Sequence, residues 1–358
     1  MLLPKINNAF FQKLVLLSLT FVLVLASCKK DSSTPAPTPA DKTALQAKVT
    51  EAQALYDGAV EGTKPGQYEA GAKASFQTVL NAAKAVLADA SATQTAVTNA
   101  LAQLQAAMDT FKTHLIKEIA SANLIGFWKM NGNPADSSGK GNNGVLTAGH
   151  AYFGAGMPTL TTDRFGRANM AYHFDKGGNI EVPYSTALNP QQLTISLWFR
   201  KTVDGRTVNT DTYTMVALNR WNGYKFQLQS ANKLFFTIKA NNGTDTTIYD
   251  RDDETAVMDN ETWYHGVVTY KAGQMNFYVN GDLVKSWDNT PYTPITLPNP
   301  MNFVIGQDLP TSKYHTVDDD FQVAWGGFWT GELDDVMFYN VALDATQVKS
   351  IYNNQKTL

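Results

Sequence analysis

The spacing of hydrophobic positions changes once along the chain and divides it into two folded segments. From Asp41 to about Leu115 the chain is rich in Ala, Gln and Leu, and its apolar residues recur every three or four positions. That spacing is typical of amphipathic helices that pack their apolar faces together. It predicts a three-helix bundle within residues 41–117. The apolar faces are Leu45, Val49, Ala52 and Tyr56; Phe76, Leu80, Ala83 and Leu87; and Val97, Leu101, Leu104, Met108, Phe111 and Leu115.

Helix-breaking residues separate the three helical runs. Lys64-Pro65-Gly66 lies between the first and second runs, and Asp89 to Thr93 lies between the second and third. Ser91 or Thr93 can cap the third helix, because a side-chain oxygen can accept hydrogen bonds from its first free N–H groups.

From about Asn123 to Leu358 the apolar residues recur at every second position. The odd positions of Leu193–Arg200 are all apolar, and Met275, Phe277 and Val279 line one face of another strand. Asn280-Gly281 follows that strand and favours a tight hairpin turn, because both residues accept positive φ. Many short strands of this kind predict an antiparallel sandwich over residues 123–358. Further strands are expected at 124–130, 215–218, 224–228, 234–238, 263–270, 303–305 and 333–339.

The first residues have the pattern of a bacterial lipoprotein signal peptide. Lys5 and Lys13 lie ahead of an apolar run, Leu14–Leu25, and Cys28 follows the run. The run is too short to span a bilayer comfortably, since a spanning helix needs about 20 apolar residues. We therefore expect residues 1–27 to be removed and Cys28, the only cysteine, to carry acyl chains that bind a membrane. The alternative is an ordinary secretory signal peptide with an unrelated cysteine.

Residues 28–40 are expected to form a solvated tether. The stretch Lys29–Ala40 consists largely of Pro, Ser, Thr and Ala, a composition typical of extended linkers. Lys30-Asp31 resembles the lysine-plus-acid export signal of surface lipoproteins in Bacteroidetes-type bacteria. The expected location is the outer membrane or cell surface, with the protein lipid-anchored there.

Composition narrows the classes of partner. The formal net charge is -3, which argues against a nucleic-acid partner, because such a partner requires a basic face. Aromatic residues make up 11% of the chain and charged residues 17%, a balance typical of a folded protein. The oligomeric state is left open.

The helical segment resembles a FIVAR-type module, a small three-helix bundle of exported bacterial proteins. The residues that carry the resemblance are Gly62, Gly66-Gln67-Tyr68, Leu80–Ala83, Thr93-Gln94 and the closing stretch from Ala100-Leu101 to Phe111. The resemblance implies a spacer or a sugar-associated module. The segment contains no polar cluster that suggests chemistry, which favours a spacer.

The second segment resembles the LamG-like, concanavalin A-like jelly roll family, through motifs that follow one another in order. They are Leu124–Trp128, Asp136–Gly144, Asp163–Gly166, Ala171–Asp175, Ile180–Pro183, Leu188–Pro190, Thr194–Phe199, Trp263–His265, Val267 and Val268, Tyr278–Gly281, Gly331–Val336, Tyr339-Asn340 and Ala342-Leu343. Lys176 interrupts the usual turn after Phe174-Asp175, and residues 250–259 form an insertion.

The resemblance implies a two-sheet sandwich with one concave face, and a function in carbohydrate binding or adhesion. The predicted fold class is therefore α+β: a small three-helix bundle followed by an all-β concanavalin A-like jelly roll. The same fold also hosts glycosidases, so the fold alone does not decide the function.

A row of acids is the candidate for catalysis. Glu332 and Asp334 share one face of a strand, and Asp335 follows them. The row resembles the Glu-x-Asp-x-x-Glu pattern of concanavalin-type beta-glucanases, but Met337 stands where the last acid is needed. A retaining glycosidase requires a pair of carboxylates, so we predict no catalytic residues. His173 and His265 lie in strands and are expected to be structural.

A calcium site is expected at the loop Asp136–Gly144. Hard cations prefer clustered oxygen ligands, and the predicted ligands are Asp136, Asn143 and, from the last strand, Asp334. The alternative is an Asx-capped turn without metal. The acidic run Asp318-Asp319-Asp320 is interpreted as a solvated loop.

Sugar binding requires exposed aromatic rings beside polar groups. Three stretches qualify: Trp221-Asn222-Gly223-Tyr224, Trp325 to Trp329 with Tyr314 and His315 nearby, and Tyr249 in the insertion. The expected glycan-binding residues are Trp221, Asn222, Tyr224, Tyr249, Trp325 and Trp329. The alternative for each ring is packing in the core. We expect Trp128, Trp198 and Trp263 to lie in the core or on the sheet surface.

Together these observations predict a lipid-anchored protein whose jelly roll binds glycan without catalysis. A glycosidase or lyase is the first alternative, and a carboxylate pair facing a cleft would support it. A protein–protein adhesin is the second, and a flat apolar patch would support that.

Overall fold

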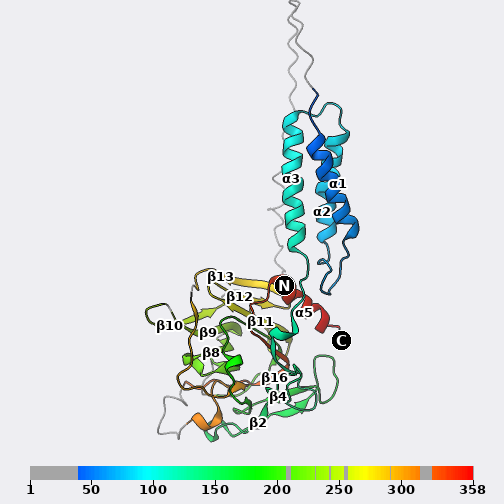
Figure 1. Cartoon of the computed structure of the whole chain (residues 1–358). Coiled ribbons are helices and arrows are strands. Elements are labelled where there is room, and N and C mark those ends of the chain that lie inside the picture. The colour runs from blue at the N-terminus through cyan, green and yellow to red at the C-terminus, as the bar shows by residue number, and fades with distance from the viewer. Residues whose placement is uncertain are drawn as a thin grey trace, which may run out of the picture.

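The protein consists of a helical bundle that stands on one end of a β-sandwich (Figure 1). The computed structural model describes residues 39–357, except 207–210, 230, 242, 254–256, 291 and 315–324. Cys28, most of the predicted tether, His315 and the run Asp318–Asp320 therefore lie outside the described residues.

The bundle contains α1 (Thr43–Gly58), α2 (Ala72–Ala88) and α3 (Gln94–Thr113). The residues predicted to form its apolar faces make most of its core, and Leu45, Leu104 and Met108 are fully buried. Thr93 caps α3, since its hydroxyl accepts a hydrogen bond from the Ala96 N–H at 3.2 Å. At the end nearest the sandwich, the Phe111 ring stacks on Tyr68, with ring centroids 4.2 Å apart. The three predicted helices are confirmed.

Within the described residues, the strands form two antiparallel sheets that pack face to face. The first sheet has the order β13-β12-β11-β6-β16-β4-β3, with β1 paired to β16, and the second has the order β10-β9-β8-β7-β15-β5-β2, with β14 paired to β9. The bounds are β1 Leu124–Trp128, β2 Val145–Thr147, β3 Thr159–Thr161, β4 Ala171–Phe174, β5 Asn179–Val182, β6 Leu193–Lys201, β7 Tyr213–Leu218, β8 Tyr224–Gln229, β9 Lys233–Asn241, β10 Thr246–Asp252, β11 Trp263–Lys271, β12 Gln274–Val279, β13 Asp282–Trp287, β14 Thr293–Pro294, β15 Phe303–Ile305 and β16 Gly331–Tyr339.

This topology confirms the predicted jelly roll and its strands. The first strand pairs with the last, as Trp128 lies opposite Val336. Asn280 and Gly281 have φ angles of 52° and 78°, the left-handed conformation predicted for the hairpin between β12 and β13. Part of the predicted insertion is regular, because Asp250–Asp252 belong to β10 and pair with β9. Trp128 and Trp198 are buried and Trp263 is half-buried at the start of β11, as expected.

A helix that the sequence analysis did not predict closes the chain. α5 (Ala345–Gln355) begins with a capping box, in which Asp344 and Gln347 each accept a hydrogen bond from the other's backbone N–H. The helix packs Val348 with Val267, Tyr278 and Tyr339 of the first sheet. The indole N–H of Trp198 on that sheet donates to Gln355 Oε1 at 2.9 Å.

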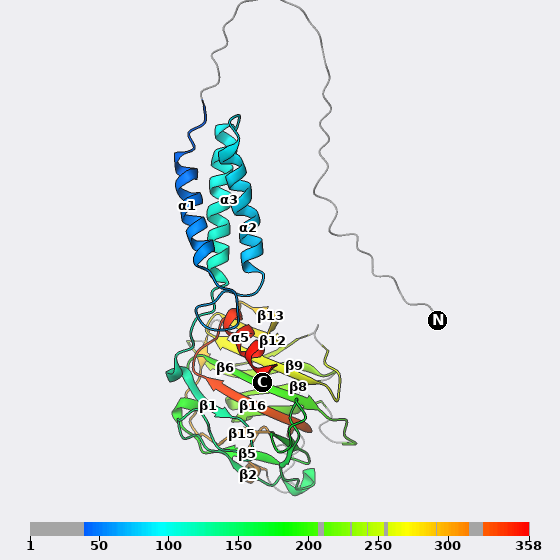
Figure 2. The ribbon, with the colours of Figure 1, turned by 90° about the vertical axis from the view of Figure 1, so that its right-hand side faces the viewer.

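α5 also joins the two domains, since it lies between the bundle and the sandwich (Figures 1 and 2). The Ser350 hydroxyl and the Asn354 side-chain amide both donate to the carbonyl oxygen of Thr63, which lies between α1 and α2. The Lys117 ammonium pairs with Asp344 at 3.2 Å. The bundle and the sandwich are therefore in direct contact through side chains of the last helix.

Candidate functional site

Two of the predicted sugar-binding rings, Trp221 and Trp325, meet on the surface of the sandwich. Trp221 lies in the short helical turn η4 (Arg220–Asn222), which links β7 to β8 in the second sheet. Trp325 lies a few residues before β16 and is 59% exposed. The rings pack edge to face, with centroids 6.4 Å apart and planes at 69°. Residues distant in the sequence thus form one aromatic surface.

The turn that carries Trp221 has an unusual backbone. Asn219 and Arg220 both have positive φ, 56° and 47°, a conformation that costs energy for residues other than glycine. The Asn219 side chain holds the turn against the chain before β15: its amide donates to the Asn299 carbonyl at 2.8 Å, and its oxygen accepts from the Met301 N–H at 2.9 Å. These bonds fix the turn where Trp221 begins.

Gly223 closes the same turn. A Cβ atom at this position would lie 2.2 Å from the carbonyl oxygen of Leu218, so no larger residue fits without a shift of the backbone. The Gly223 carbonyl accepts a hydrogen bond from the Lys239 N–H at 2.7 Å, which ties the turn to β9.

A buried carboxylate, Asp308, connects the segments that carry both tryptophans. Its side chain is 1% exposed and pairs with the guanidinium of Arg220, where Nε and Oδ2 are 2.7 Å apart. The Gly327 N–H donates to Asp308 Oδ2 at 2.9 Å, and the Tyr314 hydroxyl donates to Oδ1. Arg220 immediately precedes Trp221, and Gly327 is two residues after Trp325. One acid therefore positions both rings.

An apolar cluster packs next to the contacts of Asp308. Phe153, Leu309, Tyr314 and Phe328 are buried together, and Met301 packs against them. Phe328 contacts Phe153 with ring centroids 4.9 Å apart. Because protein interiors are close-packed, this cluster limits movement of the chain on both sides of Asp308.

Beside Trp221 lies a cleft of about 450 Å³. Its volume falls in the range typical of small-molecule sites. The Lys239 ammonium donates to Asn222 Oδ1 at 3.1 Å across part of the cleft. The lining combines one aromatic ring, aliphatic side chains, amides and amines: Asn219, Arg220, Trp221, Asn222, Lys239, Ile295, Pro298, Asn299, Met301, Leu309 and Lys313.

Three of the predicted sugar-binding rings lie elsewhere. Tyr224 and Trp329 are both fully buried in the main core, so neither offers a face to a ligand, and their expected exposure is corrected. The Tyr224 hydroxyl donates to the Leu188 carbonyl at 2.6 Å. Trp329 packs edge-on against Phe199. Tyr249 is half-buried on β10 beside Tyr292 and does not line the cleft.

Glu332 is held by Arg200 and His173. It accepts from Arg200 Nη1 at 2.9 Å and lies 3.1 Å from His173 Nδ1. Burial opposes its ionisation, but hydrogen bonds from His173 and Arg200 lower the pKa of Glu332 overall. The bond to Glu332 in turn raises the pKa of His173. This carboxylate therefore ties β4, β6 and β16 together.

The buried side chain of Arg164 forms ion pairs with Asp334 and Asp335, the two acids that come after Glu332 on β16. Burial and the charge of Asp335 raise the pKa of Asp334 to about 8, although Arg164 opposes the shift. Arg164 also donates to the carbonyl of Gln355 on α5. The acidic row thus joins the first sheet to α5, whereas the tryptophan cleft belongs to the second sheet.

His265 is structural, as expected. Its ring is fully buried, and burial lowers the pKa of His265 to about 3, so it is neutral at physiological pH. Its Nε2 lies 2.8 Å from the Ser196 hydroxyl on the neighbouring strand.

The predicted calcium loop is held by hydrogen bonds. Asp136 Oδ1 accepts from the N–H groups of Phe127 and Ser138, and Oδ2 accepts from the Asn142 N–H and the Ser138 hydroxyl, all within 2.9 Å. Burial opposes ionisation, but these bonds lower the pKa of Asp136. Asn143 Oδ1 accepts from the Asp136 N–H. These bonds form the Asx-capped turn that the sequence left as the alternative.

The third predicted ligand, Asp334, lies beyond β1. Trp128 bridges to Asp136 at one edge and pairs with Val336 at the other, so β1 separates the loop from β16. In the part of the chain that the structure describes, no three His, Cys, Asp or Glu side chains gather as a metal site would require. The three predicted ligands are therefore not brought together in this geometry, which favours the Asx-capped turn over the calcium site.

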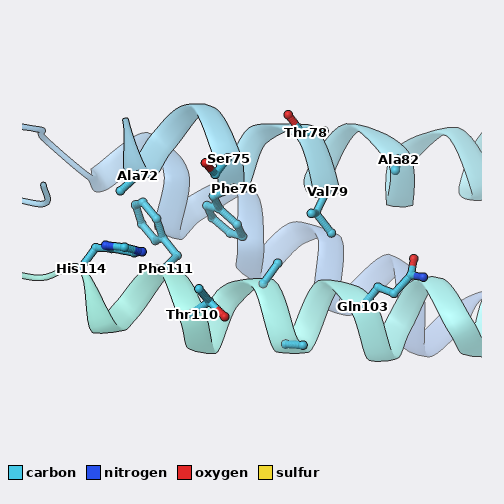
Figure 3. Close-up of a pocket in the computed structure, with 12 residues that line it drawn as sticks. Ala72, Ser75, Phe76, Thr78, Val79, Ala82, Gln103, Thr110, Phe111 and His114 are labelled. Atoms are coloured by element: carbon cyan, nitrogen blue, oxygen red, sulfur yellow. The ribbon is translucent and has the colours of Figure 1, made fainter. Parts of the chain in front are cut away.

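A second cleft, of about 510 Å³, runs between α2 and α3 (Figure 3). Four alanines, Phe76, Val79 and Phe111 form its apolar walls, and the His114 ring lies at one end. The His114 Nδ1 atom lies 2.7 Å from the Glu69 carboxylate there. The lining also includes the polar residues Ser75, Thr78, Gln103 and Thr110. Most of the accessible surface of this groove is apolar.

Sequence comparison shows that much of the sandwich is similar to a known family. The family described as the concanavalin A-like lectin/glucanases superfamily matches residues 174–349. A gellan lyase from Bacillus sp is 42% identical over 78 residues, which are 22% of this chain and 3% of that protein. The chain therefore spans only a small part of this relative.

Solved structures with a similar course of the chain share little sequence with it. Domain 4 of AbnA, a GH43 extracellular arabinanase from Geobacillus stearothermophilus, in complex with arabinotriose, is 18% identical with a TM-score of 0.45, over 64% of this chain and 98% of that one. The binding domain of Paraclostridial Mosquitocidal Protein 1 is also 18% identical, with a TM-score of 0.44, over 66% and 53% of the two chains.

Replacement of the connecting acid, Asp308→Asn, should destabilise the protein strongly. The replacement breaks the buried ion pair with Arg220, and loss of one partner of such a pair costs about 3–5 kcal/mol. Asp282→Asn is the matched control, because Asp282 pairs with Lys349 at the surface, where such pairs contribute about 0–1 kcal/mol. Urea unfolding followed by tryptophan fluorescence measures both. Equal losses in the two variants would contradict the role assigned to Asp308.

The loop Asp136–Gly144 is tested by thermal unfolding with calcium and with EDTA. Since the Asp136 carboxylate already accepts four hydrogen bonds, we expect midpoints that agree within about 1 °C. Asp136→Ala should cost about 1–3 kcal/mol under both conditions, because buried N–H groups lose their acceptor. A midpoint several degrees higher in calcium, lost in Asp136→Ala, would instead establish the predicted metal site.

Proposed function

We propose that this concanavalin A-like jelly roll domain binds carbohydrate, without catalysis, in the cleft beside Trp221 and Trp325. The observation that carries the proposal is that Trp221 lines a cleft that also presents amide and amine groups, and that the largely exposed Trp325 packs against Trp221. Aromatic faces stack on the apolar side of a sugar ring, and side-chain amides such as Asn222 and Asn299 bond its hydroxyls. Both kinds of group are present within one site.

The site is fixed before a ligand arrives. Asp308, Asn219 and Gly223 each hold the tryptophan segments through contacts within the protein. A ligand therefore does not have to order these loops, and a preorganised site avoids part of the entropic cost of binding. This matters for sugars, whose hydroxyls exchange hydrogen bonds with water for similar bonds with the protein.

The match of residues 174–349 to the concanavalin A-like lectin/glucanases superfamily supports the proposal, because that superfamily includes lectins. The 78 residues shared with a gellan lyase also connect part of this chain to a protein that acts on a polysaccharide. That similarity is too short to transfer an activity, so cleavage of gellan is not proposed.

The first alternative, a glycosidase or lyase, is less well supported. Among the described residues that line the tryptophan cleft, no carboxylate occurs, whereas a retaining glycosidase requires two. The acids that resembled a glycanase motif are engaged with Arg164, Arg200 and His173.

The second alternative, a protein–protein adhesin, would require a contiguous apolar patch. The large exposed hydrophobic side chains of the described residues come from separate segments, for example Val60, Val145, Val203, Val257 and Leu283. This alternative is retained for the case in which no glycan binds.

The proposal predicts that Trp221→Ala and Trp325→Ala each weaken glycan binding about tenfold or more, because loss of a stacked ring removes more than about 1.4 kcal/mol. A glycan array followed by affinity electrophoresis of the full chain measures this. Tyr249→Ala is the control, since that half-buried ring lies outside the cleft. Release of sugar products would establish an enzyme, and a larger effect of Tyr249→Ala would move the site to β10.

We also propose that Cys28 is lipidated and that residues 28–40 and the FIVAR-like bundle hold the sugar-binding domain away from an outer membrane. The support is the lipoprotein-like pattern of residues 1–28. None of the helices in the described residues has the length and apolar character needed to cross a bilayer.

Cys28→Ser should therefore move the protein from the detergent phase to the aqueous phase in Triton X-114 partition, and abolish incorporation of labelled palmitate. The untreated wild-type chain is the reference in both assays. Equal partition of the two proteins would leave the ordinary secretory signal peptide as the explanation.

A further inference from the structure

We infer that the cleft beside Trp221 selects glycans that carry negatively charged substituents, either uronate carboxylates or sulfate esters. This inference rests on the proposed carbohydrate-binding function and adds the chemical class of the ligand. It follows from the charges that line the cleft.

The described residues of the cleft carry positive charge only. Lys239, Lys313 and Arg220 contribute to the lining, and neither Asp nor Glu does. The charge of Arg220 is balanced by Asp308 below the surface. Among the described lining residues, Lys239 and Lys313 therefore leave an excess of positive charge, although the whole chain has a net charge of -3.

The two lysines differ in how they are held. Lys313 is exposed, whereas Lys239 is half-buried and its ammonium donates to the neutral oxygen of Asn222 at 3.1 Å. An ammonium group has three hydrogens to donate, so Lys239 retains donors for a ligand while Asn222 orients it. Lys225 adds charge behind the aromatic ring, with its ammonium 5.9 Å from the Trp221 centroid.

The rest of the lining suits the apolar faces of a sugar. Trp221, Ile295, Pro298, Met301 and Leu309 contribute carbon surface. A neutral glycan would cover this surface and partly desolvate Lys239 without supplying a counter-charge. A carboxylate or sulfate on the sugar supplies that charge, and such charge-assisted hydrogen bonds are about twice as strong as neutral ones.

The test uses matched pairs of polymers with the full chain. Polygalacturonate is compared with its methyl ester, and dextran sulfate with dextran, so that the carboxylate and the sulfate are tested separately. We expect binding to at least one charged polymer and at least tenfold weaker binding to its neutral counterpart. Binding to the charged polymer should weaken as NaCl rises from about 50 to about 500 mM, because salt screens charges at the surface.

Charge reversal locates the effect. Lys239→Glu with Lys313→Glu should weaken binding of the charged polymer about tenfold or more. Lys140→Glu with Lys271→Glu makes the same change in net charge at two exposed positions outside the cleft, and should have little effect. Lys313→Gln alone replaces an exposed side chain and keeps the test valid if the double variant does not fold.

The outcomes separate this inference from the proposed function. Equal binding of charged and neutral polymers, unchanged by the lysine replacements, would overturn the inference and leave carbohydrate binding in place. Binding of a charged polymer that persists in Trp221→Ala, or that both double variants weaken equally, would show non-specific attraction and also overturn it. Failure to bind any glycan, neutral or charged, would overturn both.

Discussion

The geometry of the candidate site depends on one buried contact, the ion pair of Asp308 with Arg220. The Asp308 carboxylate also receives the Gly327 N–H and the Tyr314 hydroxyl, so three segments converge on it. A buried ion pair contributes little net stability compared with apolar packing, but loss of one partner is costly. Its effect here is on position, because it holds the backbone beside Trp221 and the backbone near Trp325 to one carboxylate.

The acids of β16 show how a motif can be misread when its partners are unknown. Glu332 and Asp334 share a strand face, as the acids of a glycanase motif do. In this protein, however, Glu332 pairs with Arg200 and Asp334 pairs with Arg164. Arg164 also reaches the last turn of α5, which in turn contacts the bundle through Ser350 and Asn354. The first sheet thus serves assembly of the two domains, and the second sheet carries the candidate binding site.

Much of the fold could be predicted because the spacing of apolar residues within a helix or strand can be seen in a short stretch of sequence. It predicted α1–α3, most long strands and the Asn280-Gly281 hairpin. The same alternation places Tyr224 in phase with the apolar residues Phe226 and Leu228, so its burial was readable from its own strand. α5 was missed, although Asp344 and Gln347 have the spacing of a capping box.

The site was less predictable, because its key contacts join residues far apart in the sequence. The glycine and asparagine neighbours of Trp221 and Trp325 indicated surface positions, and the structure brings the two rings together. Asp308 gave no signal in the sequence, since Arg220 lies 88 positions away. Lys239 and Lys313 were missed for the same reason: each is an ordinary surface lysine until the fold places both at one cleft.

The most direct test of this account is a crystal structure of the full chain soaked with an oligosaccharide that the glycan array identifies. The account predicts a sugar ring stacked on Trp221 or Trp325, beside Asn222 and Lys239, with Asp308 still paired to Arg220. A sugar bound at β10, in the groove between α2 and α3, or in a site formed only after the Asp308 contact breaks would contradict it.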